Sequence, residues 1–214
     1  MTFFNIELVK LELDYAFSKN SETLLLNLLK KNSFLLSEIY DRHFGIRPNF
    51  NEVSFGDTYR CDFCWLNDNS DGAEWVIVEI EKPKMKLFTK QGEPTSELNH
   101  AIEQIKSWQR YFDKFPSEKS RIFGAVSRFR WILVAGDKND WLNHEALAWR
   151  EHNNRTTNIE VRSSDIFYRA LDKYEKITDH FWSFEEHPVS LAAKDLQTYC
   201  LNDDYLNFWK QRLN

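Results

Sequence analysis

Residues 59–82 read YRCDFCWLNDNSDGAEWVIVEIEK, two segments rich in apolar residues on either side of a polar turn. The first segment, 59–66, has the composition of a β-strand, and NDNSDG at 67–72 consists of turn-forming residues. The second segment, 74–82, contains the run VIV, which is typical of a central strand buried on both faces. Pro83 lacks the N–H that a strand ladder needs and ends this segment. The stretch therefore predicts a β-hairpin whose second strand lies inside a sheet.

Three acidic residues fall near the open end of this hairpin. Side chains alternate along a strand, so Glu79 and Glu81 point to the same face. With the turn centred near residue 70, the numbers of paired residues add up to about 140, which brings Asp62 within reach of Glu79. Carboxylates are costly to bury without a cation, and carboxylate oxygens suit Mg²⁺ or Mn²⁺. The spacing predicts a metal site, but it leaves open that the acids are exposed on an edge strand.

The segments around the hairpin favour a mixed α/β sheet with flanking helices. Residues 1–15 fit either a strand or a helix. Periodic apolar residues predict helices from Ser21 onward, over 33–43, over 97–112 and from Ser163 or Ser164 to about 174, with strands at 131–135 and 159–162 and a helical tail over 179–214. We expect one domain over 1–214, with a core at about 20–175 and a helical C-terminal extension over 176–214.

Composition excludes several classes of protein. The chain has 214 residues, of which 42% are hydrophobic, and this is ample for a packed core. No run of residues approaches the roughly 18 apolar positions that a membrane span needs, the first 15 residues are unlike a signal peptide, and three cysteines suggest no disulfide framework. We therefore expect a cytoplasmic protein. The net charge of −5 weighs against general DNA binding, yet it permits a basic patch beside an acidic metal site.

The hairpin and the segments beside it resemble a known family. SFGDTYRCDF (54–63), VIVEIEKPKMKLF (76–88), LNHAIEQIKSWQRY (98–111) and LLLNLLKKNSFLL (24–36) are similar to the nuclease domain of the Shedu anti-phage proteins. The family pattern is an Asp-Phe strand, an ExK-like strand followed by proline, and a helix that contains a glutamine. In this chain these positions are Asp62, Glu79, Pro83 and Gln104. The resemblance extends over roughly residues 20–172.

The resemblance implies a PD-(D/E)xK restriction-endonuclease-like core and a Mg²⁺- or Mn²⁺-dependent DNA endonuclease or nickase. Asp62 and Glu79 would hold the metal, with Gln104 beside them. The family's lysine position is occupied by Glu81, which could complete the metal site or accept the proton of the attacking water. The same substitution supports an alternative, an inactive nuclease fold that acts as a binding module. Cleavage of RNA is a third possibility.

The resemblance also implies a homo-oligomer. Family members usually carry a sensing region ahead of the nuclease domain, so we expect a separate sensor or regulatory partner here. A row of lysines directly after the acids is positioned to contact DNA phosphates, although a solvated loop would have the same composition. These lysines are Lys82, Lys84, Lys86 and Lys90.

Three other features have a functional and a structural interpretation. Cys61 and Cys64 form a CxxC pattern, but residues three apart on a strand face opposite sides, so we expect core packing rather than zinc or redox chemistry. His100 lies one helical turn before Gln104, and we favour a structural role for it over a place in the site. For Trp108 and Tyr111 we favour the core over base stacking.

Overall fold

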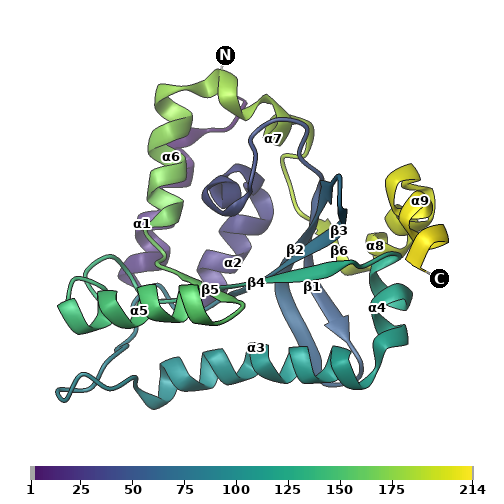
Figure 1. Cartoon of the computed structure of the whole chain (residues 1–214). Helices are drawn as coiled ribbons and strands as arrows, with labels where there is room; N and C mark the ends of the chain where they lie inside the picture. The colour runs from purple at the N-terminus through teal and green to yellow at the C-terminus, as the bar shows by residue number, and fades with distance from the viewer. Residues whose placement is uncertain (1–2, 214) are drawn as a thin grey trace.

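The computed structural model describes residues 3–213 and contains a six-stranded mixed sheet with helices on both faces (Figure 1). The strands are β1 (Asn49–Phe55), β2 (Tyr59–Asn69), β3 (Gly72–Ile80), β4 (Arg128–Val134), β5 (Ile159–Arg162) and β6 (Leu191–Ala192). They lie in the order β5-β4-β3-β2-β1-β6. Neighbours among β1, β2 and β3 are antiparallel, whereas β3, β4 and β5 are parallel. The prediction that the VIV strand is central is confirmed.

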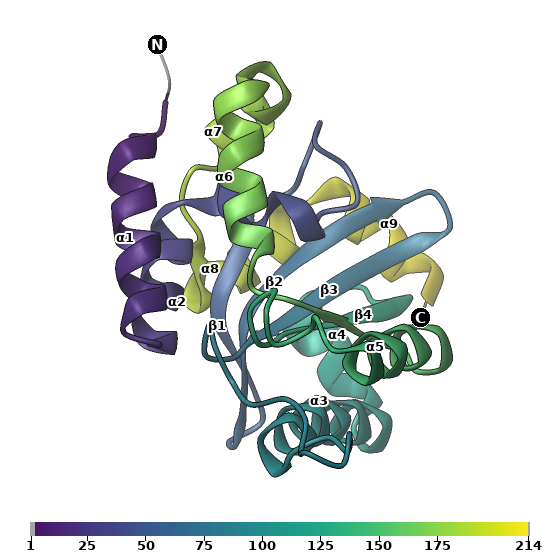
Figure 2. The same ribbon diagram turned by 90° about the vertical axis from the view of Figure 1, so that its left-hand side faces the viewer.

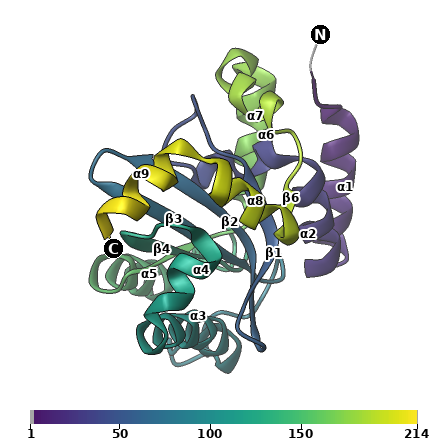
Figure 3. The ribbon, with the colours of Figure 1, turned by 90° about the vertical axis from the view of Figure 1, so that its right-hand side faces the viewer.

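The sheet separates two apolar cores, and helices cover each of them (Figures 2 and 3). One core is closed by α1 (Ile6–Ser18), α2 (Glu22–Lys31), the 3-10 helices η1 (Ser33–Ile39) and η2 (Thr178–Phe181), α6 (Ile166–Lys176) and α7 (Trp182–Glu186). The other is closed by α3 (Ser96–Lys114), α4 (Pro116–Phe123), α5 (His144–Thr156), α8 (Ala193–Asn202) and α9 (Asp204–Leu213). Along β3 the side chains alternate between the cores: Trp75 and Ile77 face α3, and Val76 and Val78 face α6.

The hairpin of β2 and β3 has the predicted register to within one residue. Phe63 is paired with Val78, so the numbers of paired residues add up to 141. The turn is shorter than the predicted 67–72, because residues 67–69 continue the ladder with 72–74 and only Ser70 and Asp71 lie between the strands. Gly72 has a φ of +138° at the end of this turn, a conformation that glycine adopts without steric cost.

Part-way along the pairing of β1 with β2, the alternation of side chains between the two faces of the sheet is interrupted. Glu52 has a φ of +53° and lies across from Asp62, between the pairs Asn51–Phe63 and Val53–Cys61. At this irregular position the alternation of β2 is interrupted, so that Cys61 and Cys64 face the same core and Phe63 faces the other. Our expectation that the thiols point to opposite sides was wrong. Both cysteines are buried, in agreement with core packing.

Other elements confirm or correct the sequence interpretation. Of residues 1–15, which fitted either structure, 6–15 form most of α1, and the first two lie outside the described residues. Ser21 caps α2 as predicted. The helix predicted over 33–43 is the shorter η1, and β1, α4, α5 and β6 were not predicted. The N-cap of α6 is Asp165 instead of Ser163 or Ser164. Within the described residues, no helix is both long and apolar enough to cross a membrane.

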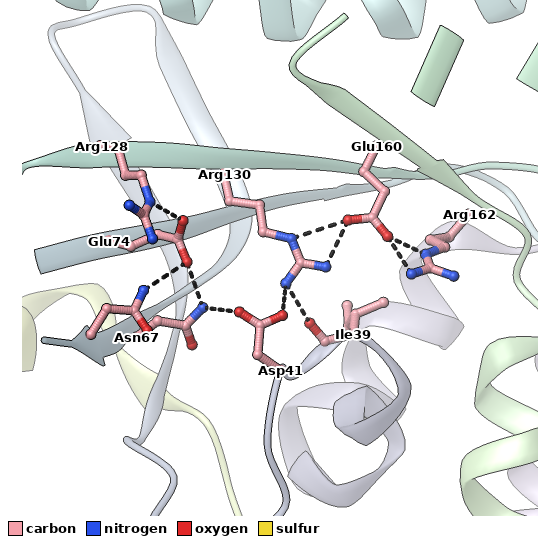
Figure 4. A network of polar contacts seen from close by, with 9 residues as sticks. Ile39, Asp41, Asn67, Glu74, Arg128, Arg130, Glu160 and Arg162 are labelled. Atoms are coloured by element: carbon pink, nitrogen blue, oxygen red, sulfur yellow. Dashed lines mark hydrogen bonds and ion pairs between the residues drawn. The ribbon is translucent and has the colours of Figure 1, made fainter. Parts of the chain in front are cut away.

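A polar network crosses the sheet on the face toward α6 (Figure 4). Arg130 of β4 is at its centre and bridges Asp41 and Glu160, at 2.6 Å from the latter. On one side, Asn67 connects Asp41 to Glu74. Burial alone would raise the pKa of Glu74, but the hydrogen bonds from Asn67 and from an arginine, Arg128, bring it below its ordinary value. The network therefore compensates charges that lie at the border of the apolar core.

The outer edge of β5 is covered by one side chain of α5. The amide of Asn154 donates to the carbonyl of Val161 at 3.1 Å and accepts from its N–H at 2.8 Å. The neighbouring Asn153 donates to the carbonyl of Ile159 at 2.8 Å. These contacts satisfy backbone groups that an edge strand would otherwise expose.

Candidate active site

A pocket of about 730 Å³ opens between the β1–β2 turn, the adjoining ends of β2 and β3, and the middle of α3. Five of its thirteen lining residues are acidic, against one arginine and one histidine, Arg60 and His100. The acids are Glu22, Asp57, Asp62, Glu79 and Glu103. Two of the predicted metal ligands, Asp62 and Glu79, thus lie in one pocket, as the hairpin register requires.

Asp62 and Glu79 come from adjacent strands, one step beyond the pair Phe63–Val78. The carboxylate of Asp62 accepts a hydrogen bond of 2.7 Å from the backbone N–H of Ile80. This contact joins the two strands beyond their last ladder pair. It also fixes the Asp62 carboxylate at the end of β3, next to Glu79.

Gln104 of α3 completes the immediate surroundings of Glu79. Its amide donates a 2.5 Å hydrogen bond to Oε1 of Glu79. The other oxygen, Oε2, is buried and has no hydrogen-bond partner among the described residues. A buried carboxylate oxygen without a partner is destabilising, so the site holds an acceptor that a cation would satisfy.

The electrostatics of the three central acids have a common origin. Burial raises the pKa of Asp62 to about 7, although the hydrogen bond from Ile80 opposes this. Burial, and then the charge of Asp62, raise the pKa of Glu79 well above its ordinary value. For Glu81, burial and then the charge of Glu22 raise the pKa. Groups of this kind concentrate at functional sites, because each shift stores an interaction that a cation relieves.

Glu81 lies beyond the end of β3 and is half-buried. Its N–H donates to the carbonyl of Val134 at 2.9 Å, which extends the parallel pairing with β4. It is not among the residues that line the pocket. The structure therefore brings Asp62 and Glu79 together in the pocket, whereas Glu81, the third predicted ligand, is not part of its lining.

Glu22 was missed by the sequence interpretation. It is the first residue of α2, lines the pocket, and raises the pKa of Asp62, Glu79 and Glu81 through its charge. An acid in the first turn of a helix is ordinarily explained by the helix dipole. Only the tertiary position of α2 distinguishes Glu22 from such an acid.

The remaining predicted residues are found on the surface or in the core. The lysines at 82, 84 and 86 are exposed and alternate with buried Pro83, Met85 and Leu87, and Lys90 is exposed in the turn that the bridge between Phe88 and Pro94 encloses. Contrary to the role we favoured, His100 is exposed and lines the pocket. Trp108 is buried in the core, as predicted, and also forms part of the pocket wall.

The donor set fits a hard divalent cation that keeps part of its water shell. Across residues 3–213, no three His, Cys, Asp or Glu side chains are close enough together to form a group that could hold a metal. Mg²⁺, however, usually keeps several waters and takes only one or two carboxylates from a protein. Asp62 and Glu79 supply two carboxylates, and the unpaired Oε2 of Glu79 provides an oxygen that is free to coordinate.

The sheet, the helix against it and the acidic pocket define an α/β protein with a carboxylate site at the end of a central strand. Residues 19–168 match the model of the family described as Shedu protein SduA, C-terminal, and the chain belongs to this family. The match contains Asp62, Glu79, Glu81 and Gln104. The family is associated with defence against phage. No individual curated protein matches the chain significantly.

Proposed function

We propose that the chain is a metal-dependent DNA endonuclease or nickase that hydrolyses phosphodiester bonds in anti-phage defence. The observation that supports this function is the pair Asp62 and Glu79, two carboxylates from adjacent strands in one open pocket, with Oε2 of Glu79 buried and unpaired. Burial of like charges side by side destabilises the fold. Such an arrangement is reasonable where a cation and a substrate phosphate occupy the pocket during function.

Each residue has a distinct role in this proposal. Asp62 and Glu79 hold Mg²⁺ or Mn²⁺, which when bound polarises the phosphodiester and lowers the pKa of water. Gln104 orients Glu79 through its hydrogen bond to Oε1 and leaves Oε2 available to a cation. Glu81, whose pKa is raised and which lies outside the pocket lining, completes the site and accepts the proton of the attacking water.

The DNA backbone meets the loop that follows β3. Lys82, Lys84 and Lys86 are exposed on one side of this extended segment because the residues between them are buried. Lysines act as mobile point charges toward phosphate, and with Lys90 they offset the acidic pocket. Assembly into a homo-oligomer and control by a separate sensor are further parts of the proposal that derive from the family resemblance.

Cleavage of plasmid DNA tests the assignment directly. The purified chain should nick supercoiled plasmid with Mg²⁺ or Mn²⁺ and not with EDTA. Glu79→Gln should reduce the rate by at least about a thousandfold, since it removes a metal ligand. Glu175→Gln, an exposed acid on α6, is the matched control and should cleave at the wild-type rate. Equal cleavage by Glu79→Gln and wild type would refute the role of the pocket, and an RNA substrate in parallel decides between the two nucleic acids.

A second candidate function is a catalytically inactive nuclease fold that serves as a binding module. The observation that favours it is Glu81, which occupies the position of the family's lysine. Binding of Mn²⁺ separates the two candidates. An active centre should bind Mn²⁺ and lose this affinity in Asp62→Asn, whereas an inactive module should bind Mn²⁺ equally weakly before and after the substitution.

A further inference from the structure

A second pocket, of about 460 Å³, lies between α5 and α6 at the outer end of the sheet. Its walls come from the loop after β4, from α5, and from the segment that leads from β5 into α6. Its volume is within the range of small-ligand sites. None of its lining residues belongs to the pocket of Asp62 and Glu79. The charged residues that line it are Lys138, Arg150, Asp165, Arg169 and Asp172.

Arg150 differs from the arginines around it. Arg162 is paired with Glu160, and Arg169 is paired with Asp165. Among residues 3–213, by contrast, no carboxylate forms an ion pair with Arg150, and no acceptor takes a hydrogen bond from its guanidinium. Burial lowers the pKa of Arg150, and the charges of Arg162 and Arg169 also lower it, against the opposing effect of Asp165. A half-buried cation thus has no ion-pair partner among the described residues, and Asp165 acts on it only through its charge.

The guanidinium of Arg150 is held in position by an aromatic ring. Its Cζ lies 4.8 Å from the centre of the Trp141 ring. Trp141 is itself buried, and its Nε1–H donates to the carbonyl of Ala135 at 2.8 Å. An aromatic ring attracts the flat face of a guanidinium and leaves the N–H donors in its plane free. The side chain is therefore fixed before any ligand arrives, and its donors remain available.

We propose that this pocket binds a phosphate group, with Arg150 as the principal ligand and Lys138 as a second cation. The planar guanidinium matches two oxygens of a phosphate in a bidentate arrangement. We assign the phosphate to the backbone of the nucleic-acid strand whose neighbouring phosphate lies at Asp62 and Glu79, and in this respect the inference rests on the proposed function. A free phosphate ester, such as a mononucleotide, presents the same chemistry and is distinguished by the experiment below.

The position of the pocket supports a strand that reaches both sites. β3, β4 and β5 are parallel, so their carboxyl ends lie along one edge of the sheet. Glu79 is near the end of β3, and Ser163, which lines the second pocket, directly follows β5. β3 and β5 are two strand spacings apart, about 10 Å, so a nucleic-acid strand of several nucleotides is long enough to pass along this edge from one site to the other. The hydroxyl of Ser164 donates to the carbonyl of Pro83 at 3.0 Å and connects the lysine-bearing loop to this pocket.

Phosphate binding is measured first, without metal or cleavage. In wild-type protein in EDTA, the Nε–Hε NMR signal of Arg150 should shift on titration with inorganic phosphate and, more strongly, with a mononucleotide. Arg212 is the matched internal control, because its guanidinium also lies on a ring, 3.8 Å from the centre of Phe208, yet lines neither pocket. Its signal should not move. No shift for Arg150, or equal shifts for both arginines, would overturn the site.

DNA binding in EDTA then identifies the source of the phosphate. Arg150→Gln should weaken binding of a short single strand on the order of tenfold and lower the slope of log K against log salt by about 0.7. Arg150→Lys should retain part of the affinity, Arg212→Gln all of it, and melting temperatures verify folding. If phosphate shifts the Arg150 signal but Arg150→Gln leaves the salt slope of DNA binding unchanged, the pocket binds phosphate, and the assignment of this phosphate to a nucleic-acid strand is overturned. None of these measurements requires cleavage. Failure of the proposed nuclease activity can therefore be distinguished from failure of the proposed phosphate site.

Discussion

Gln104 on α3 and Glu79 on β3 are joined by a hydrogen bond between the amide of one and Oε1 of the other, 25 residues apart in sequence. The contact fixes the carboxylate at the point where the central strand leaves the sheet. It also satisfies only one of the two carboxylate oxygens. The arrangement gives Glu79 a defined direction while it keeps a coordination site open.

Removal of this hydrogen bond should weaken metal binding. In Gln104→Ala, Glu79 loses its orienting partner, and we expect a loss of Mn²⁺ affinity of about 10- to 100-fold, as for other outer-shell partners. Calorimetric titration with Mn²⁺ measures the effect. Gln109→Ala, on the same helix but hydrogen-bonded to Asn158, is the control and should bind like wild type. Unchanged affinity in Gln104→Ala would remove Gln104 from the site.

The metal-free protein should lose stability as the pH rises through the range of Asp62. The pKa of Asp62 is about 7 in the folded chain, above the ordinary 3.8, so its contribution to folding is complete below about pH 4 and disappears between pH 4 and 7. Thermal unfolding in EDTA at several pH values tests this. The Asp62→Asn variant should lose less stability as the pH rises. At pH 8 its melting temperature should exceed that of wild type by about 2–4 °C for each kcal/mol gained.

Two controls distinguish this effect from a general pH dependence. Asp113→Asn, an exposed acid on α3, should keep the decline of the wild type. Saturating Mn²⁺ should remove the decline in wild type but not act on Asp62→Asn, because the cation binds the ionised carboxylates. A flat wild-type profile in EDTA would contradict the raised pKa.

Arg130 should be the arginine whose loss costs the most stability in the network of Figure 4. Its side chain is only 22% exposed and pairs with Asp41 and Glu160. Arg130→Met leaves these acids partly uncompensated, and we expect a loss of about 1–3 kcal/mol in urea unfolding. Arg110→Met removes an exposed pair, in which both side chains are more than half exposed, and should cost less than about 1 kcal/mol. Equal losses would mean that burial of the network is irrelevant.

Gly72 should be intolerant of any side chain. A Cβ at this position would lie 2.1 Å from Oγ and 2.5 Å from Cβ of Ser127, at a φ of +138°. Gly72→Ala should therefore lower the free energy of unfolding by about 1–3 kcal/mol. Gly45→Ala is the control, since Gly45 also has a positive φ but has nothing within 4 Å of the added Cβ, and its cost should be about 1 kcal/mol. A similar cost at both positions would exclude the clash.

The features that could be predicted from sequence are those set by local rules. The alternation of apolar residues and the turn chemistry determine the hairpin of β2 and β3, and with it the approach of Asp62 to Glu79. The helical periodicity of α3 likewise determines that Gln104 and Trp108 lie one turn apart. Both predictions required only neighbours in sequence or in one hairpin.

The features that were missed depend on contacts between distant segments. Glu52 adopts a left-handed conformation for which its residue type gives no signal, and across from it the alternation of β2 is interrupted, so that Cys61 faces the same core as Cys64. Glu22 enters the pocket only because α2 packs against the end of the sheet. A single sequence shows no periodic pattern that would reveal either the left-handed residue or the packing of α2 against the sheet.

The side chain of Asn154 occupies the place of a seventh strand beside β5, since it binds both backbone groups of Val161. No further strand can therefore pair with this edge of the sheet while the amide is in place. A neighbouring copy would have to displace the Asn154 amide before it could add a strand there. Growth of the sheet into an intermolecular ribbon would have to begin on the opposite border, at the two residues of β6. If copies associate, they would have to use helical surfaces, and Asn154→Ala would expose a template for aggregation.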